Sequence, residues 1–467
     1  MSDPEYERLR SAHLAEVSAA MQGHVDRLGW SRGQIERYRD DRLRALLGYA
    51  RQRSPFHSRR LAGVDTETVG VADLASLPVM TKQQAQDEWD AIITAPAPDR
   101  AGAERVLAEQ RWFSYTPLDQ QVFSSGGSSG VRGVYVWSWS FYLSATCLAW
   151  RMQARDERRS AASEGPARLA VLCAAVPPHA STPLFDVATT DPMSTTVIEA
   201  GAPFDEVVDR VAALDPTHLV GYATVIGRLA RATTAGDLPI RPRRVSTNSE
   251  PLLPEDLEAI RRAWDPVVHN LWGSTEIGVQ AVGCGRGEGL HICEDEVILE
   301  RVDDAGLPVG PDEPATRTLA TGLANRTFPF IRYDLGDEVT LVDGECPCGS
   351  AFRRVAAVTG RRDDDFGYGG VTVPASAFRH VLGGDPRITE YQVVQTADGA
   401  EILVVGAPDV AGVCAAVEAA VGRYGLPKPQ ISLRVLDRLR RHEASGKLRR
   451  FVPLKTGTQM NNDVADS

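Results

Sequence analysis

Seven consecutive serine and glycine residues, 124–130, separate two stretches that read as strands. Backbone N–H groups in a glycine-rich turn can line a concavity that binds an anion, and serine hydroxyls add further donors. Glycine also lets the backbone approach phosphate oxygens closely. The spacing is neither G-x-x-x-x-G-K-[ST] nor G-x-G-x-x-G, so on this stretch alone a flexible hairpin tip is an equally good interpretation.

A second group of residues that could do chemistry consists of Cys284, His291, Cys346 and Cys348, which form a C-x₆-H pair and a C-x-C pair. Three thiolates and one imidazole suit tetrahedral Zn²⁺, and four protein ligands would leave no open position, so the site would be structural. Cys293 is a competing ligand, and a set of unligated thiols is the alternative. The remaining cysteines, Cys147, Cys173 and Cys414, lie in apolar stretches and are expected in the core.

The elements that must position these residues alternate between apolar strands and helices. A buried strand is expected in 167–176. PTHLVGYATVIGRLARAT and RRVSTNSEPLLPEDLEAIRRAW each read as a short strand followed by a helix, and PVVHNLWGSTEIG reads as a strand that runs into a polar loop. The first stretch, to about Leu47, reads as helix, and Thr81 is a plausible N-cap. This alternation predicts an α/β fold. The sequence predicts an N-terminal domain over 1–361, a small domain over 362–455 and a disordered tail over 456–467.

The composition bounds the possible functions. The chain has 467 residues and a formal net charge of −11, which argues against nucleic acid as the main partner. No apolar run approaches the roughly 20 residues that a membrane span needs. The N-terminus is charged and the seven cysteines are an odd number, so we expect a cytoplasmic protein without a disulfide framework.

Six segments occur in order along the chain: SGGSSGVRG, NSEP, LWGSTEIG, IRYDLGD, GRRDD and SGKLRR. Together they resemble the signature segments of the adenylate-forming superfamily of acyl- and aryl-CoA synthetases. LASLPVMTK and the cysteine-rich GCGRGEGLHI and CPCG segments are similar to the phenylacetate–CoA ligase branch. The resemblance spans Leu43 to Leu454. It implies a large multi-layer N-terminal adenylation domain, a small mobile α+β C-terminal domain and an active site between them.

The resemblance also implies a reaction. A carboxylate attacks the α-phosphate of ATP, giving an acyl-adenylate and pyrophosphate, and CoA then displaces AMP. Lys447 would reach the carboxylate and the α-phosphate, Thr275 would contact the α-phosphate, and Glu276 would bind Mg²⁺ through a carboxylate oxygen. Asp337 would hold the ribose hydroxyls, and Asp363 matches the hinge position. The other implied ATP-binding residues are Ser125, Gly126, Gly127, Ser128, Ser129, Gly130, Arg132, Ser249, Glu250, Pro251, Trp272, Gly273 and Arg361.

Two departures from the family pattern bear on function. The family's loop commonly ends Gly-Lys-Pro, whereas this chain reads Gly130-Val131-Arg132, so Arg132 is the expected substitute for the missing lysine. In the small domain, Thr372 and Phe378 stand where the family tends to have an Asn and a Glu, in the part that the resemblance assigns to the second half-reaction.

The acid is expected to bind among His179, Tyr222, Trp272 and Gln280, each of them as pocket wall, and the branch favours an aromatic acid.

Three functions therefore stay open. The leading interpretation is an ATP-dependent aryl- or acyl-CoA ligase. The second is an adenylating enzyme that passes the activated acid to a carrier-protein thiol, an amine or another nitrogen nucleophile. The third is a non-catalytic nucleotide-binding relative, against which the presence of Lys447, Asp337 and Glu276 argues. The helical N-terminus leaves a homodimer open as an oligomeric state.

Overall fold

The computed structural model describes residues 4–110, 115–125, 132–160, 167–174, 177–185, 194–310, 313, 315–356, 358, 364–385, 387–442 and 446–454. The chain divides into two compact units. The first comprises Met1–Leu252, Asp256–Val358 and Ala444–Gly446, and the second comprises Leu253–Glu255, Thr359–Glu443 and Lys447–Ser467. The expected domain boundary at 361/362 and the expected tail at 456–467 both lie outside the described residues.

The N-terminal helices cover part of the first unit. The stretch predicted as helix to about Leu47 is two helices, α1 (Pro4–Arg27) and α2 (Arg32–Arg53). They separate because Gly29 lies in a turn and Ser31 starts a new helix, its N–H donating to Oε1 of Gln34 at 2.9 Å. The elements that follow are α3 (Pro55–Arg60), the 3₁₀ helix η1 (Val71–Ser76), α4 (Lys82–Asp87), α5 (Trp89–Ile92) and α6 (Arg100–Glu109).

Thr81 caps α4 as predicted. Its Oγ1 accepts a hydrogen bond from the N–H of Gln84 at 3.2 Å, and Oε1 of Gln84 accepts from the N–H of Thr81 at 3.0 Å. This reciprocal capping box satisfies two N–H groups that the first helical turn leaves unpaired.

A sheet of nine strands, counted within the described ranges, forms the centre of the first unit, in the order β13-β14-β9-β8-β7-β6-β5-β3-β4. Strands β4, β3, β5, β6 and β7 run parallel, whereas β7, β8, β9, β14 and β13 pair antiparallel. The bounds are β3 (Arg168–Cys173), β4 (Ser194–Glu199), β5 (His218–Tyr222), β6 (Arg244–Asn248), β7 (Val267–Ser274), β8 (Gly278–Val282), β9 (Leu290–Ile292), β13 (Leu341–Val342) and β14 (Arg354–Val355).

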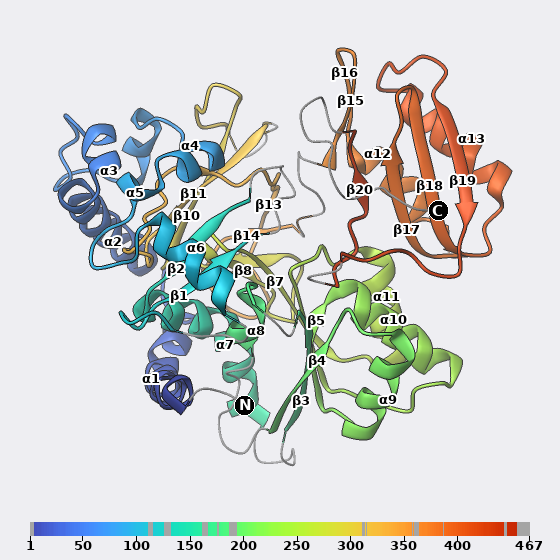
Figure 1. The fold of residues 1–467 in the computed structure, drawn as a ribbon, viewed down its shortest axis with the longest axis horizontal. Helices are drawn as coiled ribbons and strands as arrows, with labels where there is room; N and C mark the ends of the chain where they lie inside the picture. The colour runs from blue at the N-terminus through green and yellow to red at the C-terminus, as the bar shows by residue number, and fades with distance from the viewer. Residues whose placement is uncertain are drawn as a thin grey trace. The chain divides into compact units, whose positions relative to one another are not determined.

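Helices cover both faces of the parallel strands (Figure 1). On one side lie α7 (Trp139–Ser160) and α8 (Ser181–Phe185), and on the other lie α9 (Phe204–Leu214), α10 (Ala223–Ala235) and α11 (Pro254–Trp264). Because both faces are covered, β3 and β5 are almost wholly buried and read as continuous apolar runs. The layered arrangement confirms the predicted α/β fold class.

Two smaller sheets complete the first unit. β1 (Gln121–Ser124) and β2 (Val134–Trp137) form an antiparallel hairpin, as the sequence predicted on either side of the serine and glycine stretch. β10 (Val297–Val302), β11 (Arg317–Gly322) and β12 (Tyr333–Asp334) form an antiparallel sheet.

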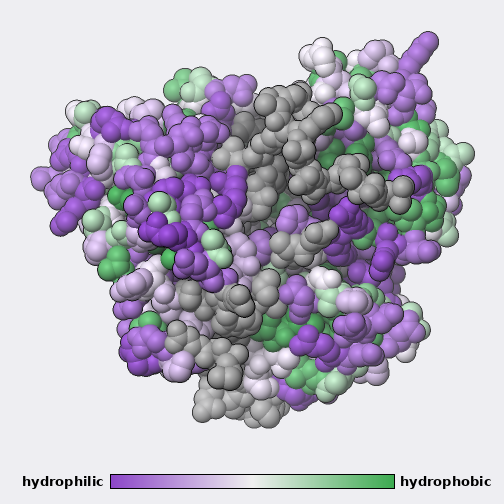
Figure 2. All heavy atoms as spheres, viewed as in Figure 1, coloured by the Kyte–Doolittle hydropathy of each residue, from purple (hydrophilic) through white to green (hydrophobic). Residues whose placement is uncertain are grey.

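The second unit has α+β texture. Its four-stranded sheet has the order β19-β18-β17-β20, with α12 packed against α13 and β17, and α13 against β19. Figure 2 shows apolar side chains gathered at the edge of this unit that carries α13 and β19, where Val410 and Val435 are exposed. The bounds are β15 (Phe366–Tyr368), β16 (Val371–Val373), α12 (Ala375–Leu382), β17 (Ile388–Gln395), β18 (Gly399–Gly406), α13 (Val410–Gly422), β19 (Gln430–Val435) and β20 (Phe451–Val452). Among the helices that the structure describes, none is long and apolar enough to cross a membrane.

Candidate functional site

The expected site residues of the first unit follow the carboxyl ends of adjacent parallel strands. Thr275 and Glu276 come directly after β7, and Ser249 comes directly after β6. Tyr222 is the last residue of β5, and His179 lies six positions beyond β3. These four strands neighbour one another in the order β7-β6-β5-β3, and the sheet changes from parallel to antiparallel at β7. In open α/β sheets, ligands bind in the crevice outside the carboxyl ends of the strands.

Two tyrosines hold the carboxylate of Glu276. The hydroxyl of Tyr135 in β2 donates to Oε1 at 2.7 Å, and the hydroxyl of Tyr333 in β12 donates to the same oxygen at 3.1 Å. Burial, together with the negative charge of Glu276, raises the pKa of Tyr135 well above its ordinary value. Tyr135 is therefore a permanent donor, and within the described residues no hydrogen bond engages Oε2 of Glu276. That oxygen is available to a hard cation.

The segment that carries Thr275 and Glu276 is fixed from several sides. The indole N–H of Trp137 donates to the carbonyl oxygen of Thr275 at 2.9 Å. The hydroxyl of Ser274 accepts from the N–H of Ile277 and from Nε2 of Gln280, both at 3.2 Å. A site on such a fixed turn needs little reorganisation when a ligand binds.

Trp272 and Asp337 are hydrogen-bonded to each other. Nε1 of Trp272 lies 2.9 Å from Oδ2 of Asp337, and both residues are 8% exposed. Asp337 follows β12, so this bond ties the antiparallel sheet to β7. A Cβ added to the neighbouring Gly273 would lie 2.7 Å from the carbonyl oxygen of Gly278, which explains why a glycine follows the tryptophan.

The segment Ser249–Pro251 is fixed by local hydrogen bonds. Oε2 of Glu250 accepts from the N–H and the hydroxyl of Thr224, at 3.1 and 2.7 Å, in the first turn of α10. The carboxylate therefore caps that helix, where negative charge is favourable. Ser249 has a left-handed backbone with φ of 62° and donates to Oδ1 of Asn248 at 2.9 Å.

Arg132 is engaged by a carboxylate. Its Nη1 donates to Oε2 of Glu104 in α6 at 2.7 Å, and about half of its side chain is exposed, at 51%. Burial opposes ionisation of Glu104, but the bonds from Arg132 and Arg100 prevail, and the pKa of Glu104 is lowered. Ser125 pairs with Gly133 on the other side of the loop. The remaining loop residues, Gly126, Gly127, Ser128, Ser129 and Gly130, and also Arg361 and Asp363, lie outside the described residues.

The residues expected to line the acid pocket are buried or partly buried. Tyr222 is fully buried, and its hydroxyl accepts from the N–H of Ala174 at 2.9 Å. Gln280 is also fully buried. His179 is partly buried before α8. Lys447 belongs to the second unit, four residues before β20, and its carbonyl oxygen accepts from the N–H of His442 at 2.9 Å.

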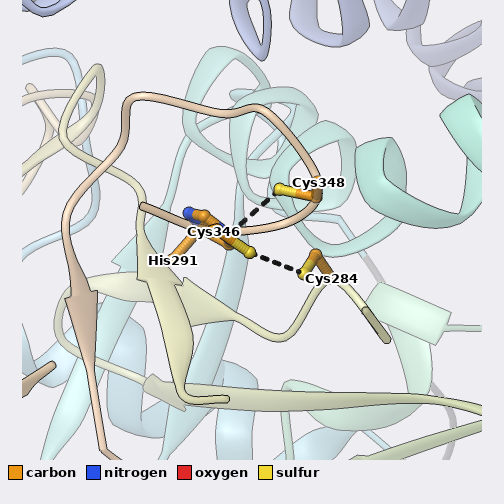
Figure 3. A group of neighbouring side chains, drawn as sticks. All are labelled: Cys284, His291, Cys346 and Cys348. Atoms are coloured by element: carbon orange, nitrogen blue, oxygen red, sulfur yellow. Dashed lines mark hydrogen bonds between the residues drawn. The ribbon is translucent and has the colours of Figure 1, made fainter. Parts of the chain in front are cut away.

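Cys284, His291, Cys346 and Cys348 lie together, with their ligand atoms within 4.8 Å of one another (Figure 3). Cys284 follows β8, His291 lies in β9, and the other two come from the loop between β13 and β14. Two pairs are close: Sγ of Cys284 to Sγ of Cys346 at 3.5 Å, and Sγ of Cys348 to Nε2 of His291 at 3.3 Å. Tetrahedral zinc with Zn–S bonds of roughly 2.3 Å places ligand sulfurs about 3.8 Å apart. The residues therefore fit the ion.

Neighbouring groups orient these ligands. Nδ1 of His291 lies 3.0 Å from the carbonyl oxygen of Phe352, to which it donates, and this leaves Nε2 as the acceptor within the group. A hydrogen bond between Cys284 and Cys348 lowers the pKa of Cys348, with His291 adding to the effect, and raises the pKa of Cys284. Gly349, with φ of 80°, permits the tight turn of the C-P-C-G segment. Cys293 is buried outside the group.

The fold of this chain is similar to that of solved CoA ligase structures. Over 92% of its length the chain superposes on 91% of a 2-hydroxyisobutyryl-CoA ligase in the postadenylation state in complex with R3-HIB-AMP, with a TM-score of 0.70 and 16% sequence identity. A structure of the same ligase with 2-HIB-AMP and CoA in the thioesterification state gives a TM-score of 0.58 and 18% identity, covering 91% of each chain. The chain thus has the fold of an adenylate-forming ligase, which confirms the fold implied by the resemblance.

A relative in sequence is the phenylacetate-coenzyme A ligase of Thermus thermophilus, which is 32% identical over 151 residues. The matched segment spans 30% of this chain and 34% of that ligase, about a third of the relative's length. This likeness supports the branch that the sequence suggested. No family model matches the chain.

Proposed function

We propose that this protein activates a carboxylic acid with ATP, through an acyl-adenylate, and transfers the acyl group to CoA. The observation that carries the proposal is the convergence of Trp272, Asp337 and Glu276. Trp272 and Glu276 lie four residues apart where β7 ends; Trp272 is hydrogen-bonded to Asp337, and Glu276 to Tyr135 and Tyr333. This is the edge at which an open α/β sheet binds nucleotides.

Each group has a task that suits its chemistry. Asp337, positioned by Trp272, accepts hydrogen bonds from the ribose hydroxyls, and Trp272 offers its ring to the adenine. Oε2 of Glu276 is the oxygen that would hold Mg²⁺, while Oε1 is occupied by two tyrosine hydroxyls. Mg²⁺ supplies charge neutralisation on the phosphates when bound. Lys447 supplies positive charge to the reacting carboxylate and the α-phosphate.

The finer assignments are part of the same proposal. The acid is aromatic, as the phenylacetate-like branch suggests, and the protein acts in the cytoplasm. The group of Cys284, His291, Cys346 and Cys348 holds one structural Zn²⁺, which supports the antiparallel part of the sheet. Support for zinc comes from the donor set and from the orientation of His291 by Phe352.

The test is acid-dependent exchange of pyrophosphate into ATP, followed by thioester formation with CoA. We expect exchange with at least one aromatic acid, and acyl-CoA and AMP as products when CoA is added. Lys447→Ala should slow adenylate formation by roughly a hundred- to thousand-fold, the cost of one lost charge at such a transition state. Arg440→Ala, in the same unit, is the matched control.

The acyl-transfer step of this experiment identifies the acceptor of the acyl group. Exchange without any CoA thioester, but with transfer to an amine or a carrier-protein thiol, would replace CoA as the acceptor and leave the adenylation step standing. Absence of exchange with every acid tested, or normal exchange in Lys447→Ala, would contradict the proposal as a whole.

A further inference from the structure

The buried carboxylate of Glu294, two residues beyond β9, is fully occupied by hydrogen-bond donors. Oε1 of Glu294 accepts from Nη2 of Arg32 and from Nε of Arg353, both at 2.8 Å. Oε2 accepts from Nη1 of Arg32 at 2.5 Å and from the N–H of Arg353 at 2.9 Å. A carboxylate has about four lone-pair sites, so Glu294 has no capacity left.

Arg39 stands beside this saturated carboxylate. It is 9% exposed, and its Nη1 lies 3.6 Å from Oε1 of Glu294 while its Nε lies 3.5 Å from Oδ1 of Asp40. These are ion-pair distances, and Nε is buried without a hydrogen-bond partner in the described part of the chain. A buried guanidinium with an unsatisfied donor is costly to a folded protein. Such a group is a candidate for binding something that the chain itself does not provide.

A cavity of about 510 Å³ opens beside Arg39. Arg32, Glu36 and Arg39 line it from one face of α2, at the i, i+4, i+7 spacing of a helix. Its volume is within the range of small-molecule sites, roughly 300–1,000 Å³. All of the lining residues belong to the first unit.

The rest of the cavity wall is largely apolar. Its side chains include Ile292, Leu299, Val309, Val339, Leu341 and Val355. Leu341, Val355 and Ile292 come from β13, β14 and β9, with Leu341 directly opposite Val355. Strand alternation places Ile292 on the face opposite to His291, so one strand serves the metal group on one side and this cavity on the other.

We propose that this cavity binds a small monocarboxylate with an apolar body, and that Arg39 receives the carboxylate. The planar fork of a guanidinium matches a carboxylate with two parallel hydrogen bonds. Arg353, whose side chain is 46% exposed, also lines the cavity and adds positive charge. Glu36 and Glu300 line it too, and Asp40 and Glu294 are close behind Arg39. These four carboxylates balance the four guanidiniums of Arg32, Arg39, Arg301 and Arg353, which favours a ligand with a single negative charge over a phosphate dianion.

The site is separate from the proposed catalytic residues. Glu276, Asp337 and Trp272 do not line the cavity, although Val339 follows Asp337 by two positions. The inference therefore does not depend on the proposed reaction, and it can be tested by binding alone, without ATP.

The experiment measures binding of octanoate and of its neutral counterpart, 1-octanol, by titration calorimetry on the full chain. We expect octanoate to bind with a dissociation constant on the order of 1 mM or tighter. Arg39→Met, which keeps the side-chain length and removes the charge, should weaken octanoate about ten- to hundred-fold and change octanol little. Arg37→Met, an exposed arginine of the same helix, is the matched control and should change neither.

A second variant tests the cavity rather than the charge. Ala72 is exposed on η1 and lines the cavity, so Ala72→Trp should fill the space without disturbing the core and weaken both ligands. Octanoate binding that is unchanged in both Arg39→Met and Ala72→Trp would locate it elsewhere and overturn the proposal. A wild-type protein that binds no octanoate at about tenfold the expected concentration would overturn it too.

Discussion

The indole N–H of Trp272 donates to the carboxylate of Asp337, with 2.9 Å between Nε1 and Oδ2. A tryptophan expected to pack against adenine is thus also the residue that orients the carboxylate expected to bind ribose. The two roles are coupled, because any change in the indole ring also changes the position of the carboxylate.

Trp272→Phe separates the two roles, since phenylalanine keeps an aromatic face and removes the donor. We expect the KM for ATP to rise about tenfold or more, the effect of losing a hydrogen bond to a charged group. Steady-state kinetics with varied ATP checks this. Trp264→Phe is the control, because within the described residues Nε1 of Trp264 has no partner. Equal KM values for ATP in the two variants would contradict the coupling.

Substitutions of Arg132 and of Glu104 are expected to change the KM for ATP in opposite directions. If Arg132 serves the phosphates of ATP, the ion pair at 2.7 Å competes with that role. Arg132→Ala should therefore raise the KM for ATP, while Glu104→Gln, which releases the arginine, should lower it. The expected changes are about two- to fivefold, because exposed ion pairs contribute under about 1 kcal/mol. A lowered KM in the double variant would show that the effect of Glu104 does not pass through Arg132.

Zinc content and stability should change together in the cysteine and histidine group. We expect one zinc per chain in the wild type and substoichiometric zinc in Cys348→Ser and His291→Ala. The melting temperature of both variants should fall by several degrees, since a structural metal contributes directly to folding free energy. Cys414→Ser, in the second unit, should keep its zinc. Metal analysis that finds no zinc in the wild type would exclude it as the resident ion.

Acid should destabilise the first unit through His57. This residue is fully buried; its Nε2 donates to the carbonyl oxygen of Pro329 at 2.9 Å, and Nδ1 accepts from Arg60 at 3.3 Å. Burial, with the charge of Arg60, lowers the pKa of His57 from 6.5 to about 3. Between these two values the unfolded state binds a proton that the folded state excludes, so stability falls as the pH falls from 6.5 towards 3.

The size of this effect is measurable by urea unfolding at pH 7 and pH 5. For each pH unit by which the pH falls well below 6.5, one such histidine lowers the free energy of unfolding by up to about 1.4 kcal/mol. His57→Gln is less stable at pH 7 but should lose less stability on acidification. His380→Gln, an exposed position, should match the wild-type pH dependence. Parallel pH dependence in all three proteins would show that His57 does not titrate in this range.

Local signals in the sequence were sufficient for much of the fold. The apolar stretches became β3, β5, β6 and β7, and the threonine before LysGlnGln became the cap of α4. These features depend on neighbouring residues, whose spacing is visible in the sequence. The four residues suited to zinc also lie together. This group could be predicted because few sets of side chains in the sequence offer the thiol and imidazole donors that zinc prefers.

Contacts between distant segments were not predictable in the same way. The pairing of Tyr135 and Tyr333 with one carboxylate oxygen joins residues 141 and 57 positions away from Glu276. Tyr135 looked like an ordinary alternating strand residue, and Tyr333 lay in the IRYDLGD segment without a role of its own. The hydrogen bonds of Glu250 could not be predicted either: its carboxylate caps α10, because the chain returns from β6 beside the start of that helix. Which donors the carboxylate of Glu250 accepts from depends on tertiary contacts that the sequence does not show.

The pairing of β14 with β9 brings residues 354–355 beside residues 290–291, and the cysteine group joins the same two stretches of chain. The chain between β9 and β13, including β10 to β12, therefore leaves the sheet and returns to it at one place. Such a closed excursion tolerates changes in length at its outer turns, because its two ends stay fixed whatever the intervening distance. The turn at Asp303–Leu307, where Leu307 is 56% exposed, is the natural position for an insertion, a reporter tag or a protease site.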